Sequence, residues 1–153
     1  MLKFHEIGNY KNSVNIGFCK ATAELHNGMV VKFDKAAKTV SLPSDATAAG
    51  LAIVHNAMDR PELDSPNDYV IAIGQYPRIF TLASLVDRLI DLDTDQVTTA
   101  YASISVGDTL IPATTGKWVK AGENDSAACA LKVIEKTSYG GEGLLVQVVI
   151  TAE

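Results

Sequence analysis

Residues 27–31 (NGMVV) and 44–54 (SDATAAGLAIV) have counterparts in the same order at residues 106–111 (VGDTLI) and 124–134 (NDSAACALKVI). Each first member carries a glycine at its second position and continues into apolar residues, which is typical of a strand that starts at a turn. Each second member runs from an Asp-containing turn through small residues into another apolar strand. An internal repeat of this kind is stronger evidence for the fold than any single motif, so we predict two similar β units.

The stretch between the two members is also repeated. A turn and then KTV at residues 38–40 correspond to a turn and then KWV at residues 117–119. We expect each unit to end in an apolar strand, at residues 69–73 in the first and 144–150 in the second. Two such units packed together predict a mostly β protein, either a small β-sandwich or a partly closed β-barrel.

One segment departs from the strand pattern. Its apolar residues recur at the three- and four-residue spacing of one helix face, at Leu82, Leu85, Val86, Leu89 and Ile90. This spacing predicts one short helix near residues 82–91, with an apolar stripe that covers an open end or edge of the sheet.

Four segments follow from these patterns. They are an N-terminal arm at residues 1–19, a first β unit at 20–81, a helical connector at 82–103 and a second β unit at 104–153. A chain of 153 residues buries roughly 68% of the surface that its unfolded form exposes. We therefore expect the four segments to form one compact domain overall.

Composition and charge narrow the function classes. No apolar run approaches the roughly 18 residues of a membrane span, and the first residues lack the apolar core of a signal peptide. We therefore expect a protein made in a cytoplasm that binds no membrane.

The net charge of −5 divides into +3 over residues 1–40 and −8 over the remainder, without a basic run. A nucleic-acid partner is therefore not expected.

The order of these features resembles the capsid decoration (cement) and head-fibre proteins of tailed bacteriophages. The resemblance rests on a glycine and an apolar strand, a short turn, Lys and Val, an Asp-x-x-Ala segment and a final apolar strand. AAGLA at residues 48–52 matches the A-x-G-(I/V/L)-A pattern of such proteins. The resemblance covers most of residues 20–80 and 104–150, whereas the insertion at 60–67 and the segment at 82–91 depart from it.

The resemblance implies a structural virion protein, made in the host cytoplasm and located on the capsid surface. It would bind the outside of the capsid and reinforce contacts between subunits of the major capsid protein as a homo-oligomer. That function needs no catalytic residues, no cofactor and no small-molecule substrate. The alternative is a small β-barrel carbohydrate-binding or tail-associated adsorption module, because Tyr76, Phe80, Tyr101 and Trp118 are suited to a sugar platform as well as to a core or an interface.

The sequence offers little for catalysis or metal binding. Its three histidines have no zinc-binding spacing, and it contains no G-x-S-x-G nucleophile motif. Asp91, Asp93 and Asp95 begin like a calcium loop, but Gln96 stands where that loop needs a glycine and Ala102 where it needs a glutamate. We expect no enzyme and no metal site, and these three aspartates are the candidate ligands if a cation binds.

Residues 75–80 are the predicted partner-binding segment. They combine Tyr76, Arg78 and Phe80, residue types that are enriched at protein interfaces, with a proline that interrupts strand pairing. Lys3 and Lys11 of the basic N-terminal arm are expected to meet an acidic shell surface.

Overall fold

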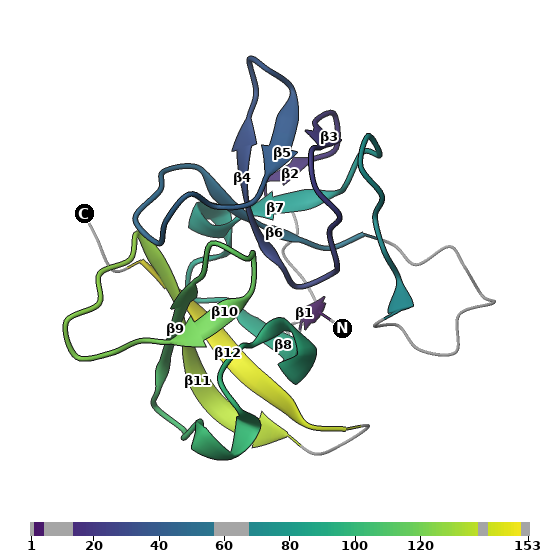
Figure 1. Ribbon diagram of the computed structural model, residues 1–153. Helices are drawn as coiled ribbons and strands as arrows, with labels where there is room; N and C mark the ends of the chain where they lie inside the picture. Colours follow the sequence, from purple (N-terminus) through teal and green to yellow (C-terminus); the bar gives the residue numbers. More distant parts are fainter. Residues whose placement is uncertain (1, 5–13, 57–67, 138–140, 151–153) are drawn as a thin grey trace.

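The computed structural model describes residues 2–4, 14–56, 68–137 and 141–150 (Figure 1). One sheet contains, in spatial order, β1 (Leu2–Phe4), β8 (Leu89–Asp93), β12 (Gly143–Ile150), β11 (Cys129–Thr137), β9 (Thr109–Pro112) and β10 (Trp118–Lys120). The other contains β2 (Asn15–Ile16), β7 (Ile79–Thr81), β6 (Leu51–Val54), β4 (Val30–Asp34), β5 (Thr39–Ser41) and β3 (Lys20–Ala21). All neighbouring strands are antiparallel except β3 and β5.

The prediction of a mostly β protein built from two similar units is confirmed. The spatial order β2-β7-β6-β4-β5 in one sheet repeats the order β8-β12-β11-β9-β10 in the other. We call the chain from β2 to β7 the first unit and the chain from β8 to β12 the second unit. Neither sheet closes into a barrel, so of the two predicted architectures the packed sheets are correct.

The repeat extends to individual hydrogen bonds. Gly28 donates its N–H to the Val54 carbonyl at 2.9 Å, and the Val54 N–H returns to the Met29 carbonyl. In the second unit the Gly107 N–H donates to the Val133 carbonyl, and the Val133 N–H donates to the Asp108 carbonyl. Asp108 thus takes the place of Met29. Both glycines have φ near +90° (93° and 92°), a conformation that favours glycine. This explains why the repeat is visible as a glycine in the sequence.

A second matching pair lies at the outer strands. The N–H and the hydroxyl of Thr22 both donate to the Val40 carbonyl, at 2.8 and 3.0 Å. Thr98 makes the same two bonds to the Trp118 carbonyl, at 2.8 and 3.2 Å. The two units are therefore structural duplicates in topology and in local bonding.

Equivalent residues also form the inner core of each unit. In the first unit these buried residues include Ile16, Leu25, Val31, Val40, Ala52, Val54 and Ile79. In the second unit their equivalents are Ile90, Ile104, Leu110, Trp118, Leu131, Val133 and Val146. Alternation along each strand places these side chains on one face of the sheet.

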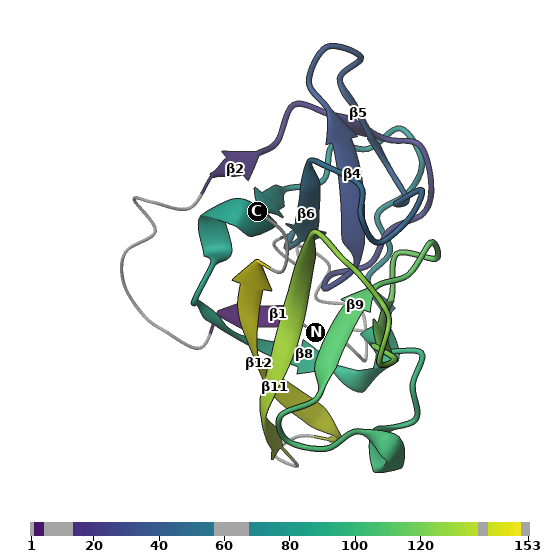
Figure 2. The ribbon, with the colours of Figure 1, turned by 90° about the vertical axis from the view of Figure 1, so that its left-hand side faces the viewer.

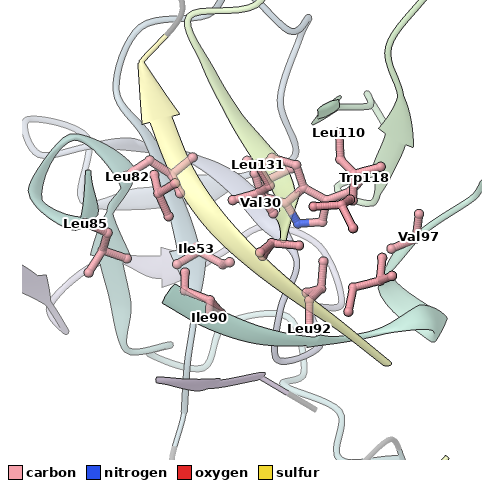
Figure 3. Packing of buried hydrophobic residues seen from close by; sticks show 14 of the residues in the cluster. Val30, Ile53, Leu82, Leu85, Ile90, Leu92, Val97, Leu110, Trp118 and Leu131 are labelled. Atoms are coloured by element: carbon pink, nitrogen blue, oxygen red, sulfur yellow. The ribbon is translucent and has the colours of Figure 1, made fainter. Parts of the chain in front are cut away.

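The first unit uses its other sheet face to dock on the second. Val30, Leu51, Ile53 and Phe80, which alternate with its own core residues, belong to the buried cluster of the second unit. Figure 3 shows Val30 and Ile53 between Trp118 and the β8 side chains. The main hydrophobic core therefore spans both units and holds them as one body.

The backbones of the two units approach closely near this core. The Trp118 indole N–H donates to the Gly28 carbonyl at 3.0 Å, and the Val30 N–H donates to the Gly116 carbonyl at 2.8 Å. A Cβ atom added to Gly116 would lie 2.6 Å from the Met29 Cε atom and 2.9 Å from a Leu42 methyl group. Glycine at position 116 therefore suits both the positive φ of 79° and the close contact between the units.

The predicted helix near residues 82–91 is wrong in extent. Only the four-residue 3₁₀ turn η3 (Leu82–Leu85) is helical, and residues 89–93 form strand β8. Leu82 and Leu85 are buried in η3, whereas Ile90 and Leu92 alternate along a strand into the core. Asp87, at φ 63°, interrupts any helix between them. The connector at 82–103 is therefore β8 with three short 3₁₀ turns, of which the others are η4 (Thr94–Gln96) and η5 (Tyr101–Ser103).

The predicted last strand of the first unit is also misplaced. Residues 69–73 form only an isolated antiparallel bridge between Leu25 and Ile71, and β7 occupies the position equivalent to β12. Tyr69 and Ile71 are buried because this segment folds across the face of the first sheet. The N-terminal arm contributes β1 to the second sheet and β2 to the first.

Candidate contact surface

The predicted partner-binding segment is divided by the start of β7. Tyr76 lies before the strand and is 54% exposed, whereas Phe80 lies inside the strand and is only 6% exposed. Phe80 faces the core that joins the two units. Its assignment to a partner surface is therefore corrected: the strand register directs its side chain inward.

Arg78 has a structural role at the edge of this segment. Its N–H donates to the Asn56 side-chain oxygen at 2.7 Å, and its Nε–H donates to the His55 carbonyl at 2.8 Å. The guanidinium carbon lies 5.6 Å from the centroid of the Phe80 ring. The half-buried Arg78 side chain thus contacts the residue after β6 through its Nε–H and the Phe80 ring of β7 through its guanidinium face. Arg78 therefore helps to hold β6 and β7 together.

Two further exposed apolar side chains belong to the backbone segments that meet beside Tyr76, which are the turn at residues 72–75 and the chain that leads into β3. Phe18 is 48% exposed and Ile73 is 66% exposed. The Lys20 ammonium lies 5.6 Å from the centre of the Tyr76 ring, within the range of a cation–π contact. We call Phe18, Lys20, Ile73 and Tyr76 the Tyr76 surface. Large apolar side chains gathered at one place on a protein often mark an interaction site.

The backbone beneath the Tyr76 surface is held firmly. Ala21 donates its N–H to the Gln75 carbonyl at 2.8 Å, and its carbonyl accepts the Gly74 N–H at 2.8 Å. The Gln75 side-chain oxygen closes the turn by accepting the Ala72 N–H. The turn at residues 72–75 is therefore bonded to Ala21 of β3 through both Gly74 and Gln75.

Positive charge lies beside this surface, on the turn between β4 and β5. Burial raises the pKa of the Cys19 thiol and Asp34 adds to that effect, whereas Lys35 and Lys38 act in the opposite direction. The Cys19 thiol also donates to the Asp34 carbonyl at 3.8 Å, so the turn that carries Lys35 and Lys38 begins beside Cys19, which Phe18 and Lys20 flank in the sequence. The Lys20 N–H also donates to the Lys38 carbonyl at 2.8 Å.

Of the two arm lysines, the structure describes the backbone position of Lys3 alone. Lys3 lies in β1, at the register position opposite Asp91 of β8 in the second sheet. Lys11 lies outside the described residues. The prediction that these lysines bind an acidic partner stays a prediction.

The three aspartates of the calcium-like stretch are separated by the end of a strand. Asp91 and Asp93 alternate along β8, and Asp95 lies in η4, where its N–H donates to the Asp93 carboxylate at 3.1 Å. Asp93 thus caps the turn that follows its strand. Across the described part of the chain, no group of three His, Cys, Asp or Glu side chains is placed to hold a metal ion.

The aromatic residues considered for a sugar platform are dispersed. Trp118 and Phe80 are buried in the shared core, and Tyr101 is half-buried with the Lys136 ammonium 4.0 Å from its ring centre. Only Tyr76 of the four is strongly exposed. The sequence did not single out Phe18 or Ile73, because Phe18 lies in a bend and Ile73 in a turn, where an isolated apolar residue leaves no periodic pattern.

No protein-family model matches the chain, and comparison with curated protein sequences gives no match. Within the described residues, no helix has the length and apolar character needed to cross a membrane.

Proposed function

We propose that this protein is a structural component of a phage virion that binds the outside of the capsid and reinforces contacts between major capsid subunits. The observation that supports this proposal is the Tyr76 surface. It presents three exposed apolar side chains and a lysine, and hydrogen bonds join β3 to the turn at residues 72–75. A rigid surface binds with little loss of conformational entropy. The virion surface would be its location and the major capsid protein its partner.

Binding to an assembled shell stabilises that shell by mass action. A protein that binds only the assembled form contributes RT ln(1 + [L]/Kd) per site, which is about 2.7 kcal/mol at a hundredfold excess over Kd. Repetition of such sites over a shell makes a modest affinity sufficient. We propose that the protein acts as a homo-oligomer, which places several Tyr76 surfaces on one lattice.

Light scattering of the purified protein and co-sedimentation with empty phage shells test this function. We expect an oligomer that sediments with shells at a fixed stoichiometry, and a Tyr76→Ala variant that sediments several-fold less. Val106→Ala is the matched control, because Val106 is an exposed apolar residue of the second unit, in the turn that precedes β9.

Two results would contradict the proposal. Protein that stays in the supernatant with every shell tested removes the capsid as partner. Selective binding on a glycan array, abolished by Tyr76→Ala, would favour the carbohydrate-binding or adsorption module instead.

A further inference from the structure

The duplication allows the two β hairpins of the protein to be compared directly. The β9–β10 hairpin of the second unit is a docking element, since its turn residue Gly116 bonds to Val30 and faces Met29 of the first unit. The equivalent β4–β5 hairpin of the first unit projects away from the second sheet, as Figures 1 and 2 both show. The side chains of its turn, residues 35–38, are all exposed. One copy of the same element is therefore docked and the other is free.

The free turn is preorganised. The Asp34 carboxylate accepts the N–H groups of Ala36 and Ala37 at 2.8 and 3.0 Å, which fixes the path of the turn. Lys38 has φ 55°, in the left-handed region that glycine adopts more easily. Strand pairing makes Gly116, at φ 79°, its equivalent, which corrects by one residue the alignment of KTV at 38–40 with KWV at 117–119. The first unit thus places a lysine where its duplicate has the residue that fits the backbone.

The side chains of the hairpin indicate the chemistry of its partner. Lys35 and Lys38 lie in the turn, and Lys20 is bonded through its N–H to the Lys38 carbonyl. The Asp34 carboxylate beside them is engaged by the turn. The ring of Tyr76, whose centre lies 5.6 Å from the Lys20 ammonium, adds an exposed apolar component beside these lysines. The free hairpin therefore presents positive charge next to exposed apolar surface.

We propose that the β4–β5 hairpin, through Lys20, Lys35 and Lys38, docks on a carboxylate-rich protein surface. This inference rests on the proposed function, in which that surface belongs to the shell. Nucleic acid fits less well, because the three lysines form no basic run in the sequence and adjoin the exposed apolar ring of Tyr76. A mixed basic and apolar surface matches an acidic protein surface.

Binding to fluorescent poly-L-glutamate at low and high ionic strength tests the hairpin directly. We expect salt-sensitive binding by the full-length protein. The double variant Lys35→Glu/Lys38→Glu should bind about tenfold more weakly, which is ~1.4 kcal/mol. Lys132→Glu is the matched control: it makes the same kind of charge reversal at an exposed site on the outer face of β11 and should bind as the wild type.

Lys38→Gly separates binding from folding. Glycine relieves the left-handed backbone at position 38, so we expect a higher midpoint of urea unfolding together with weaker binding to poly-L-glutamate. Wild-type affinity in this variant, or an equal loss in Lys132→Glu, would overturn the assignment of the hairpin. Tighter binding to duplex DNA of equal charge would overturn the protein partner.

Shell co-sedimentation is kept as a separate measurement. Loss of poly-L-glutamate binding and of shell binding in the hairpin variants supports both proposals. If the wild type binds poly-L-glutamate through the hairpin but does not sediment with shells, the hairpin inference stands and the capsid is the wrong partner. If shells bind and the hairpin variants sediment normally, the hairpin inference fails alone.

Discussion

Gly74 and Gly116 have nearly the same backbone conformation but different surroundings. Their φ angles are 86° and 79°. A Cβ atom at Gly74 would meet nothing within 4 Å, whereas one at Gly116 would meet Met29, Leu42 and the Val30 carbonyl oxygen at 3.2 Å or less. The pair therefore separates the cost of backbone strain from the cost of overpacking.

We predict that Gly74→Ala lowers the free energy of unfolding by about 1 kcal/mol, through backbone strain alone. Gly116→Ala should lower it by on the order of 3 kcal/mol, because the added methyl group also forces the two units apart. Urea denaturation measures both values. Equal losses would show that the contact between the units adapts without cost.

The half-buried His55 ring makes stability depend on pH. Desolvation by burial, with a smaller contribution from the nearby Arg78 charge, lowers the pKa of His55 from 6.5 to about 4. The unfolded chain therefore binds a proton between these values that the folded chain does not. Stability contributed by the neutral ring is present above pH 6.5 and is lost as the pH falls toward 4.

We expect the free energy of unfolding to fall more between pH 7 and pH 4 in the wild type than in His55→Gln. The difference should be on the order of 1 kcal/mol, because solvent screens a ring that is only partly buried. Urea denaturation across this range measures the two slopes, and carboxylates common to both proteins cancel in the comparison. Parallel slopes would exclude His55 as the source.

The equivalent strands β5 and β10 provide a test at the scale of the element, because each accepts a pair of hydrogen bonds from a threonine. Thr22 and Thr98 each place a backbone N–H and a hydroxyl on one carbonyl oxygen. We predict that Thr22→Val and Thr98→Val each lower the free energy of unfolding by about 0.5–1.5 kcal/mol, since each loses one hydrogen bond at nearly constant volume. Thermal or urea unfolding measures the two losses. A loss at one site alone would mean that the two bonds are not energetically equivalent.

Elements that depend on a local residue requirement could be predicted from the sequence. Gly28 and Gly107 mark equivalent turns because each adopts a φ that favours glycine, so the repeat of the two units was visible. The prediction of a helix over residues 82–91 was wrong because Leu82 and Leu85 have the spacing of a helix, and Ile90 continues the same apolar stripe. The strand alternation of Ile90 and Leu92 became decisive only through pairing with β12.

The exposure of the side chains in residues 75–80 could be predicted only in part, because it too depends on strand pairing. Tyr76 was identified from residue type, and it is exposed. Phe80, from the same segment, is buried because it pairs with Ile53 of β6, and a register set by tertiary pairing is not encoded in six residues. Lys20 joins Tyr76 only because β3 and the turn at 72–75 meet across more than fifty residues of sequence.

At the scale of the whole molecule, the shared core links the two units during unfolding. Side chains from both lie in one buried cluster, and the only tryptophan of the chain, Trp118, is bonded to Gly28 of the other unit. We predict that Trp118 fluorescence and far-ultraviolet circular dichroism report coincident urea transitions. Transitions that separate would show that one unit melts while the other stays folded.

Because one unit docks on its duplicate, some feature of the second unit must prevent further copies from docking in the same way. The two units use different faces, and a contact of that kind, repeated, would build an open filament. At three of the four docking positions the outward face of the second unit is polar: it has Thr109, Lys132 and Gln147 where the first unit has Val30, Ile53 and Phe80. At the fourth position the small residue Ala130 replaces Leu51. These differences remove most of the apolar surface on which a further copy would dock, which disfavours extension of the head-to-tail pair into a polymer.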